Sequence, residues 1–173
     1  MSAVGERNDY GLTAWDRYRI LTECRTIAMV GLSSNYYNAS SFAAVYLDAN
    51  GYDIVPVNPA QAGKREILGR PVHANLREAA ARGHRIEIVD VFRPSREVPE
   101  IAREAVEIGA RVLWMQLGVV SHEAADLARE AGLQVVMDRC CKIEHARFFG
   151  GLRTIGLNTG VITSRLAMRL PEG

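Results

Sequence analysis

The sequence predicts an α/β protein built on a doubly wound, mainly parallel five-stranded sheet with helices on both faces. Short apolar runs rich in β-branched residues alternate with segments of helical period through most of the chain. Three of these helical segments end at a glycine, and the next apolar run begins a residue or two later. Strand, helix and strand repeated at this spacing require right-handed crossovers, which generate a parallel sheet.

The first predicted element is a leading helix over residues 11–24, which precedes the alternating pattern. Trp15, Tyr18 and Leu21 or Ile20 recur at helical spacing. We therefore expect these side chains to pack on the sheet.

The predicted strands are runs of apolar and β-branched residues. The first and fourth runs are almost continuously apolar, as expected for parallel strands that are buried on both faces. The strands are predicted at 26–31, 53–57, 86–91, 112–116 and 134–138.

Three predicted helices between the strands carry apolar residues at the i, i+3, i+4 spacing of a one-sided helix. These residues are Phe42, Val45, Tyr46 and Ala49; Val98, Ile101, Ala102, Ala105 and Ile108; and Ala124, Leu127, Ala128 and Ala131.

Capping residues mark where these helices begin and end. Asn50–Gly51, Gly109 and Gly132 stand at the ends, where a left-handed residue closes a helix. Serine is a preferred N-cap, and an acidic residue in the first turn lies near the positive end of the helix dipole. The candidate pairs are Ser95 with Glu97 and Ser121 with Glu123.

The end of the sequence is less regular. Residues 142–149 are predicted as a helix that stops at Gly150–Gly151, and residues 154–163 as a small hairpin. We expect one domain over residues 1–173, with its core at about 25–149 and an irregular tail at 150–173.

Composition narrows the possible functions. The 173 residues are 48% hydrophobic and 24% charged, with a net charge of +1, and no basic patch of the kind that binds nucleic acid stands out. No apolar stretch is long enough to span a membrane, and the polar N-terminus does not resemble a signal peptide. Three cysteines do not make a disulfide framework, so a cytoplasmic protein is expected; a protein partner or homo-oligomer is left open.

The candidate binding site lies where the predicted strands end, because ligands of open α/β sheets bind beyond the carboxyl ends of the strands. Gly31 permits a tight turn after the first strand, and the following helix presents its positive end, which favours phosphate. The alternative is that Gly31 only turns the chain. The candidate residues at strand ends are Gly31, Leu32, Ser33, Ser34, Asn58, Pro59, Phe92, Arg93, Pro94, Gln116, Leu117, Gly118, Arg139 and Cys140.

The end of the second predicted strand argues against NAD. Dinucleotide folds place an acidic residue there to bind the ribose hydroxyls, whereas this chain has Asn58–Pro59. The next segment, AQAGKREILGR, contains Lys64, Arg65 and Arg70. A basic loop at this place suits an additional phosphate on the ribose, as in NADP or coenzyme A; otherwise it is a solvated surface loop.

Several segments together resemble a known family: VGLS, GYDIVPVNP, LGRPVHANLREA, VFRP, WMQLG and MDRC. Over roughly residues 20–149 the chain resembles the small stand-alone CoA-binding domains, which are similar to the Rossmann-like N-terminal domain of the succinyl-CoA synthetase α subunit. The resemblance implies that residues 31–34 surround the CoA phosphates and that Lys64 meets a phosphate. It also implies that residues 92–94 flank the nucleotide and that residues 116–118 face the adenosine or pantetheine.

No catalytic residue is expected. The resemblance does not extend to the second domain of the synthetase, which carries a phosphorylated histidine, and none of the four histidines here lies in a matching motif. The sequence thus predicts a non-catalytic protein that binds CoA or an acyl-CoA, as a sensor, carrier or partner subunit. The alternatives are an NADP-dependent or CoA-thioester enzyme and an interaction module with a vestigial crevice.

Cysteines near the last predicted strand raise two further questions. Cys141 and His145 could share a helix face with Glu144 nearby, but a complete tetrahedral metal site is not evident, so no metal is expected. Cys140 follows the strand directly, beside Arg139. It is either an inert buried residue or a thiolate that meets the CoA thiol.

Overall fold

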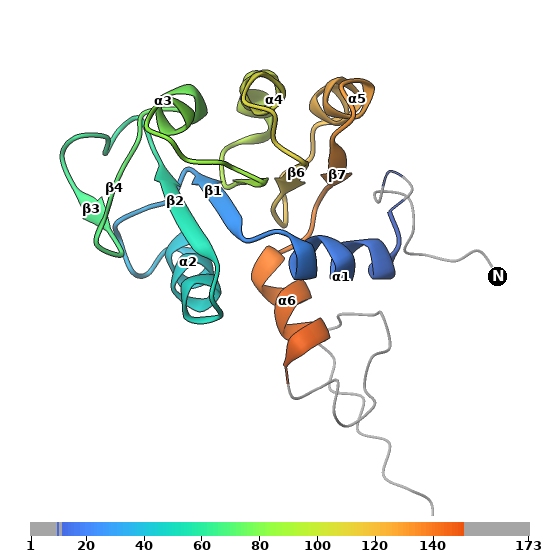
Figure 1. Cartoon of the computed structure of the whole chain (residues 1–173), viewed down its shortest axis with the longest axis horizontal. Helices are drawn as coiled ribbons and strands as arrows, with labels where there is room; N and C mark the ends of the chain where they lie inside the picture. The colour runs from blue at the N-terminus through green and yellow to red at the C-terminus, as the bar shows by residue number, and fades with distance from the viewer. Residues whose placement is uncertain (1–9, 11, 151–173) are drawn as a thin grey trace, which may run out of the picture.

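The computed structural model describes residue 10 and residues 12–150, which form a sheet covered by helices on both faces (Figure 1). The sheet has five parallel strands, and this confirms the predicted fold class. The strand order is β2-β1-β5-β6-β7. The strands are β1 (Thr26–Val30), β2 (Asp53–Val57), β5 (Ile88–Val91), β6 (Val112–Met115) and β7 (Gln134–Val136).

A short antiparallel hairpin, β3 (Glu66–Ile67) and β4 (Arg70–Pro71), lies outside the main sheet and was not predicted. Its turn places both Leu68 and Gly69 at positive φ, 54° and 67°. A two-residue hairpin turn of type I′ needs positive φ at both central residues, and a leucine at the first of them gives no turn signal in the sequence. The predicted strand at 134–138 ends at Val136, and Asp138 beyond it has a left-handed backbone (φ 57°).

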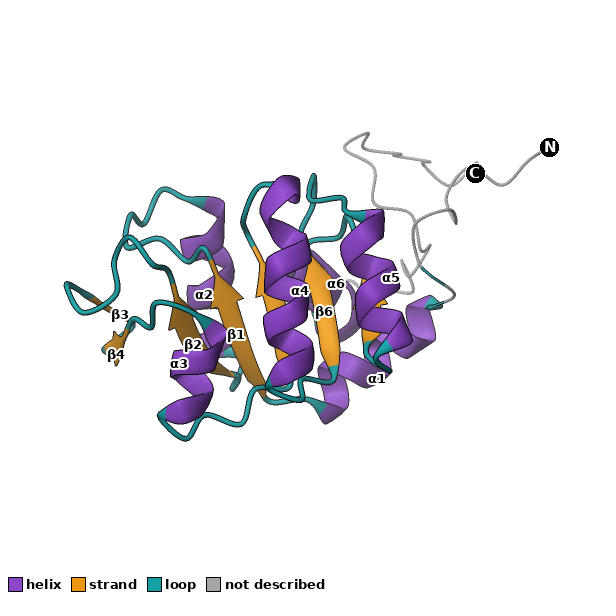
Figure 2. Cartoon of the chain, turned by 90° about the horizontal axis from the view of Figure 1, so that it is seen from above, coloured by secondary structure: helices purple, strands orange, loops and turns teal. Residues whose placement is uncertain are grey.

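The helices form two layers. In Figures 1 and 2, α3, α4 and α5 cover one face of the sheet, while α1, α2 and α6 cover the other. The helix α3 was not predicted. The helices are α1 (Ala14–Glu23), α2 (Ala39–Ala49), α3 (Leu76–Ala81), α4 (Val98–Glu107), α5 (His122–Glu130) and α6 (Cys141–Phe149).

Most predicted helix ends are confirmed, including the three glycine positions and the Ser121 N-cap, whose hydroxyl accepts the Ala124 N–H. Ser95 as an N-cap is wrong. It lies in a 3₁₀ turn before α4, and its hydroxyl instead accepts the N–H of Val120. Pro99 lies in the first turn of α4, where its missing N–H costs no intrahelical hydrogen bond. This position is consistent with a helix that begins at Val98.

The predicted buried face of α2 is wrong. Phe42 and Val45 are 55% and 45% exposed, and small residues face the sheet instead. The residues of α2 that are buried are Ser40, Ser41, Ala43, Ala44 and Leu47. The two serines turn inward because the hydroxyls hydrogen-bond to the loop that precedes the helix.

The leading helix packs as predicted through Ile20 and Leu21, which are buried. Trp15 does not pack on the sheet: it is 65% exposed and stacks on Tyr18. The inward position is taken by Arg17, which forms an ion pair with Glu144 of α6 at 2.9 Å.

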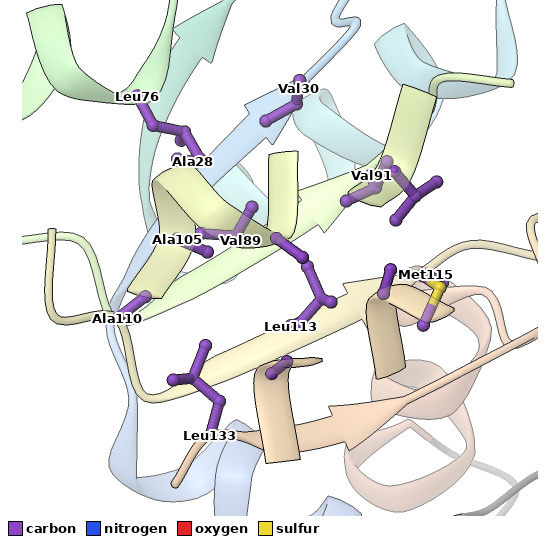
Figure 3. Packing of buried hydrophobic residues seen from close by; sticks show 14 of the residues in the cluster. Ala28, Val30, Leu76, Val89, Val91, Ala105, Ala110, Leu113, Met115 and Leu133 are labelled. Carbon is purple, nitrogen blue, oxygen red and sulfur yellow. The ribbon is translucent and has the colours of Figure 1, made fainter. Parts of the chain in front are cut away.

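Two apolar clusters fill the spaces between the layers. Figure 3 shows the cluster under α3, α4 and α5, to which Val89, Leu113 and Met115 of the strands and Ala105 of α4 belong. The second cluster packs the other face against α1, α2 and α6. None of the helices described is both long and apolar enough for a membrane span. The predicted hairpin at 154–163 lies outside the described residues.

Candidate functional site

The order of strands creates one switch point. From β1 the chain moves outward to β2 and then returns to the other side of β1 to form β5. Connections on the two sides diverge at such a point and leave a crevice at the carboxyl ends of the strands. Gly31 and Phe92 directly follow the two central strands here, and the Phe92 N–H donates to Val30 O at 2.8 Å.

Gly31 lets the two loops meet. Its φ is +90°, and a Cβ there would lie 2.8 Å from Arg93 Cδ and 3.1 Å from Phe92 O. Any side chain would therefore collide with the protein before it reached a ligand, besides straining the backbone. The glycine is needed for the close approach of the β1 and β5 loops.

The loop after β1 is held by neighbouring side chains. Ser33 N–H donates to Ser40 Oγ at 3.2 Å, and Ser34 N–H donates to Gln61 Oε1 at 3.1 Å. Ser41 Oγ donates to the carbonyl oxygens of Ser33 and Asn35. A phosphate that accepted the Ser34 N–H would thus have to displace Gln61 Oε1 from it.

Two of the predicted site residues hold the loops from inside. Leu32 is fully buried in the core. Asn58 is also buried: its Nδ2 donates to Leu32 O at 2.9 Å, and its Oδ1 accepts the Ala60 N–H. Pro59 beside it is exposed. Asn58 therefore joins the β1 and β2 loops, where a dinucleotide fold would place an acid.

Lys64 lies to one side of the switch point. It borders a hollow of about 570 Å³ between the hairpin β3–β4 and α3. None of the predicted residues that directly follow a strand lines this hollow. Three cations and two carboxylates do, together with His73 and His84: Lys64, Arg65 and Arg82 against Glu66 and Glu78. The side chains that line this hollow thus carry a net positive charge, and the hollow is separate from the switch point at Gly31.

The ends of β5 and β6 form the other wall. Arg93 Nε donates to Glu97 Oε2 at 2.7 Å, which holds the guanidinium beside the residues that follow Pro94. Leu117 is 67% exposed, and the Gly118 N–H donates to Asp138 Oδ1 at 2.7 Å. Gln116 is only 4% exposed.

Gln116 has a partner that the sequence patterns did not single out. Its Nε2 donates to Oδ1 of Asp90 at 2.7 Å, and Asp90 is completely buried in β5. Burial raises the pKa of Asp90 to about 7, against the opposing effect of the Gln116 hydrogen bond. The available signal was an acidic residue inside an apolar run.

The segment after β7 returns to the same edge. The Arg139 carbonyl accepts the Trp114 indole N–H at 2.8 Å, and Cys140 is the partly exposed N-cap of α6. Cys141 is buried, and burial raises its thiol pKa well above the ordinary value.

Two further polar side chains of α6, Glu144 and His145, are paired. Glu144 is 1% exposed and binds Arg17 and Arg147 at 2.9 and 2.8 Å, while His145 Nδ1 lies 3.0 Å from the Tyr46 hydroxyl. In the part of the chain that the structure describes, no three His, Cys, Asp or Glu side chains are arranged to hold a metal ion.

A family model described as CoA binding domain matches residues 25–146. The chain belongs to this CoA-binding domain family. An uncharacterized Bacillus subtilis (strain 168) protein, YneT, is 39% identical over 127 residues, which are 73% of this chain and 90% of that protein.

Two solved structures show the same fold. A hypothetical protein from Pyrococcus horikoshii OT3 is 35% identical with a TM-score of 0.78, and the match covers 86% of this chain and 100% of the other. The structure of cell-free ID.343 from Thermus thermophilus is 30% identical with a TM-score of 0.75, covering 80% and 100%. The family resemblance predicted from sequence is confirmed.

In this CoA-binding domain, the strand-end residues predicted from sequence gather along one edge of the sheet, and their contact with CoA remains a prediction. Leu32 and Asn58 hold the loops from within, and Lys64 lies in the separate hollow. Asp90 joins the site as the buried partner of Gln116.

Proposed function

We propose that this chain binds coenzyme A or an acyl-CoA in the crevice between the β1 and β5 loops, and that it carries out no thioester chemistry itself. The observation that carries the proposal is the meeting of Gly31 with Phe92 and Arg93 at the switch point, in a member of the CoA-binding domain family. Crevices at this point are where open α/β sheets hold nucleotides.

The surroundings suit the two ends of CoA. The loop at Ser33–Ser34 meets the first turn of α2, an arrangement that favours phosphate. The basic hollow at Lys64 offers charge for a further phosphate, and the wall at Gln116–Gly118 offers polar and apolar groups for the pantetheine arm. An acid for ribose recognition, which NAD would favour, is replaced by the inward-turned Asn58.

A non-catalytic role is supported by how the hydroxyls near the crevice are used. Ser33 Oγ accepts the Asn35 N–H, and Ser41 Oγ donates to backbone carbonyls, so both groups hold the loop. Nucleophilic catalysis requires a hydroxyl that is paired with a base. We propose that the protein acts as a sensor, carrier or partner subunit.

Titration calorimetry with CoA, dephospho-CoA, NADP and NAD tests the choice of ligand. CoA should bind most tightly. If dephospho-CoA bound as tightly as CoA, the protein would not recognise the additional phosphate on the ribose. Tighter binding of NADP than of CoA would favour an NADP-dependent enzyme. Incubation of the pure protein with succinate, CoA and a nucleoside triphosphate should form no succinyl-CoA above background; clear turnover would overturn the non-catalytic role.

A further inference from the structure

Asp90 is the one ionisable side chain buried within the five strands of the described sheet. It lies in the central strand β5, between Met29 of β1 and Trp114 of β6. Because side chains alternate along a strand, Asp90 shares a face with Ile88, which packs in the cluster against α1, α2 and α6. After burial itself, the charge of Asp90 is the largest cause of the raised Cys141 pKa, so the carboxyl lies near the first turn of α6.

Fold stability does not explain an acid at this position. Asp90 accepts one hydrogen bond, from Gln116 Nε2 at 2.7 Å, and its Oδ2 finds no partner among the described residues. A buried carboxyl with an unpaired oxygen destabilises a fold, and a well-packed apolar residue is often more stable there. The contact with Gln116 is what the acid provides.

That contact fixes the direction of an amide group. The two ends of a glutamine amide are a donor and an acceptor. Oδ1 of Asp90 acts as an acceptor both when the carboxyl is ionised and when it carries its proton on the unpartnered Oδ2, so Asp90 holds the Gln116 N–H group inward. The Gln116 carbonyl oxygen is then turned away from Asp90, at the end of β6.

We infer that Asp90 is a positioning residue: it orients Gln116 so that the amide offers a carbonyl oxygen, and not an N–H group, to the ligand. This inference rests on the proposed binding of CoA. The matching ligand groups are hydrogen-bond donors, namely the two amide N–H groups and the thiol of the pantetheine arm. Asp90 thus determines whether Gln116 presents a hydrogen-bond acceptor or a donor to the ligand, and it does so without touching the ligand.

Titration of CoA into four proteins tests this role: the wild type, Asp90→Leu, Asp90→Asn and Met29→Leu. Asp90→Leu frees the Gln116 amide and should weaken CoA binding about tenfold, since one oriented hydrogen bond is at stake. Asp90→Asn still accepts the Gln116 N–H in one of its two amide orientations, so it should stay within about twofold. Met29→Leu changes the neighbouring buried side chain at constant volume and should leave affinity unchanged.

A second readout follows Gln116 without any ligand. Its side-chain amide protons should exchange slowly with solvent, by NMR, in the wild type and in Asp90→Asn, and faster in Asp90→Leu. If leucine is too large for the site, Asp90→Val serves as the smaller substitute. The inference is wrong if the folded leucine or valine variant binds CoA like the wild type, or if Asp90→Asn loses as much affinity as Asp90→Leu. A wild type that binds no CoA but protects the Gln116 amide would instead refute the proposed function.

Discussion

Replacing Asp90 by asparagine changes how the stability of the protein depends on pH. Burial raises the Asp90 pKa from its ordinary 3.8 to about 7, so the folded protein holds a proton there more tightly than the unfolded chain does. Stability therefore falls as pH rises from about 4 through 7, because ionisation is easier in the unfolded chain. At about 1.4 kcal/mol per pKa unit, the loss above pH 7 is about 4 kcal/mol.

Asparagine has nearly the same shape and no charge to bury. Urea unfolding at pH 4, 5, 6, 7 and 8 should show Asp90→Asn increasingly more stable than the wild type as pH rises, by up to about 4 kcal/mol at pH 8. Near pH 4 the two proteins should be nearly equal in stability. A difference that is constant across this range, or a wild type that gains stability over the variant toward pH 8, would refute this account of Asp90.

The other predictions use variants with single, separable effects. Gly31→Ala adds both backbone strain and a collision, so it should destabilise the fold by about 1–3 kcal/mol more than Gly51→Ala, where φ is +87° and the Cβ meets open space; thermal unfolding measures the difference. Glu144→Ala removes the buried carboxylate that binds Arg17 and Arg147 and should cost about 3–5 kcal/mol in urea unfolding; a loss below 1 kcal/mol would contradict the buried network. Lys64→Ala should weaken CoA binding in calorimetry, by about two- to tenfold at low salt, and leave dephospho-CoA unaffected; an equal loss for both ligands would place the lysine elsewhere on the nucleotide. Cys140 should exchange with CoA disulfide, forming a mixed disulfide and releasing one CoA thiol, and mass spectrometry should find the adduct in the wild type and not in Cys140→Ser.

Sequence patterns predicted the elements that strong local signals define. The apolar runs located the five strands of the main sheet to within two residues at each end, and the glycines at 51, 109 and 132 marked helix ends correctly. The face of α2 was wrong because Phe42 and Val45 follow a helical period without being buried, while Ser40 and Ser41 turn inward to bond the loop. Hydrophobic period alone does not show which face meets the sheet when small residues pack closely.

The location of the candidate site could be predicted from the strand topology more than from the types of residue in it. Carboxyl ends of parallel strands meet at one edge, so the residues after each strand came together. Their individual roles depend on tertiary contacts: Asn58 turns inward to Leu32 O, and Arg93 pairs with Glu97. The role of Asp90 could not be predicted from the sequence because it depends on a hydrogen bond with Gln116, which lies 26 residues away in the chain.

The proposed function requires CoA to lie at the switch point between β1 and β5. Hydrogen–deuterium exchange followed by mass spectrometry, with and without saturating CoA, locates the ligand on the intact chain. CoA should slow exchange at residues 31–35 and 92–94 and at the end of β6, and leave the opposite ends of the strands unchanged. Protection confined to the hollow between the β3–β4 hairpin and α3, with none at residues 31–35, would contradict it.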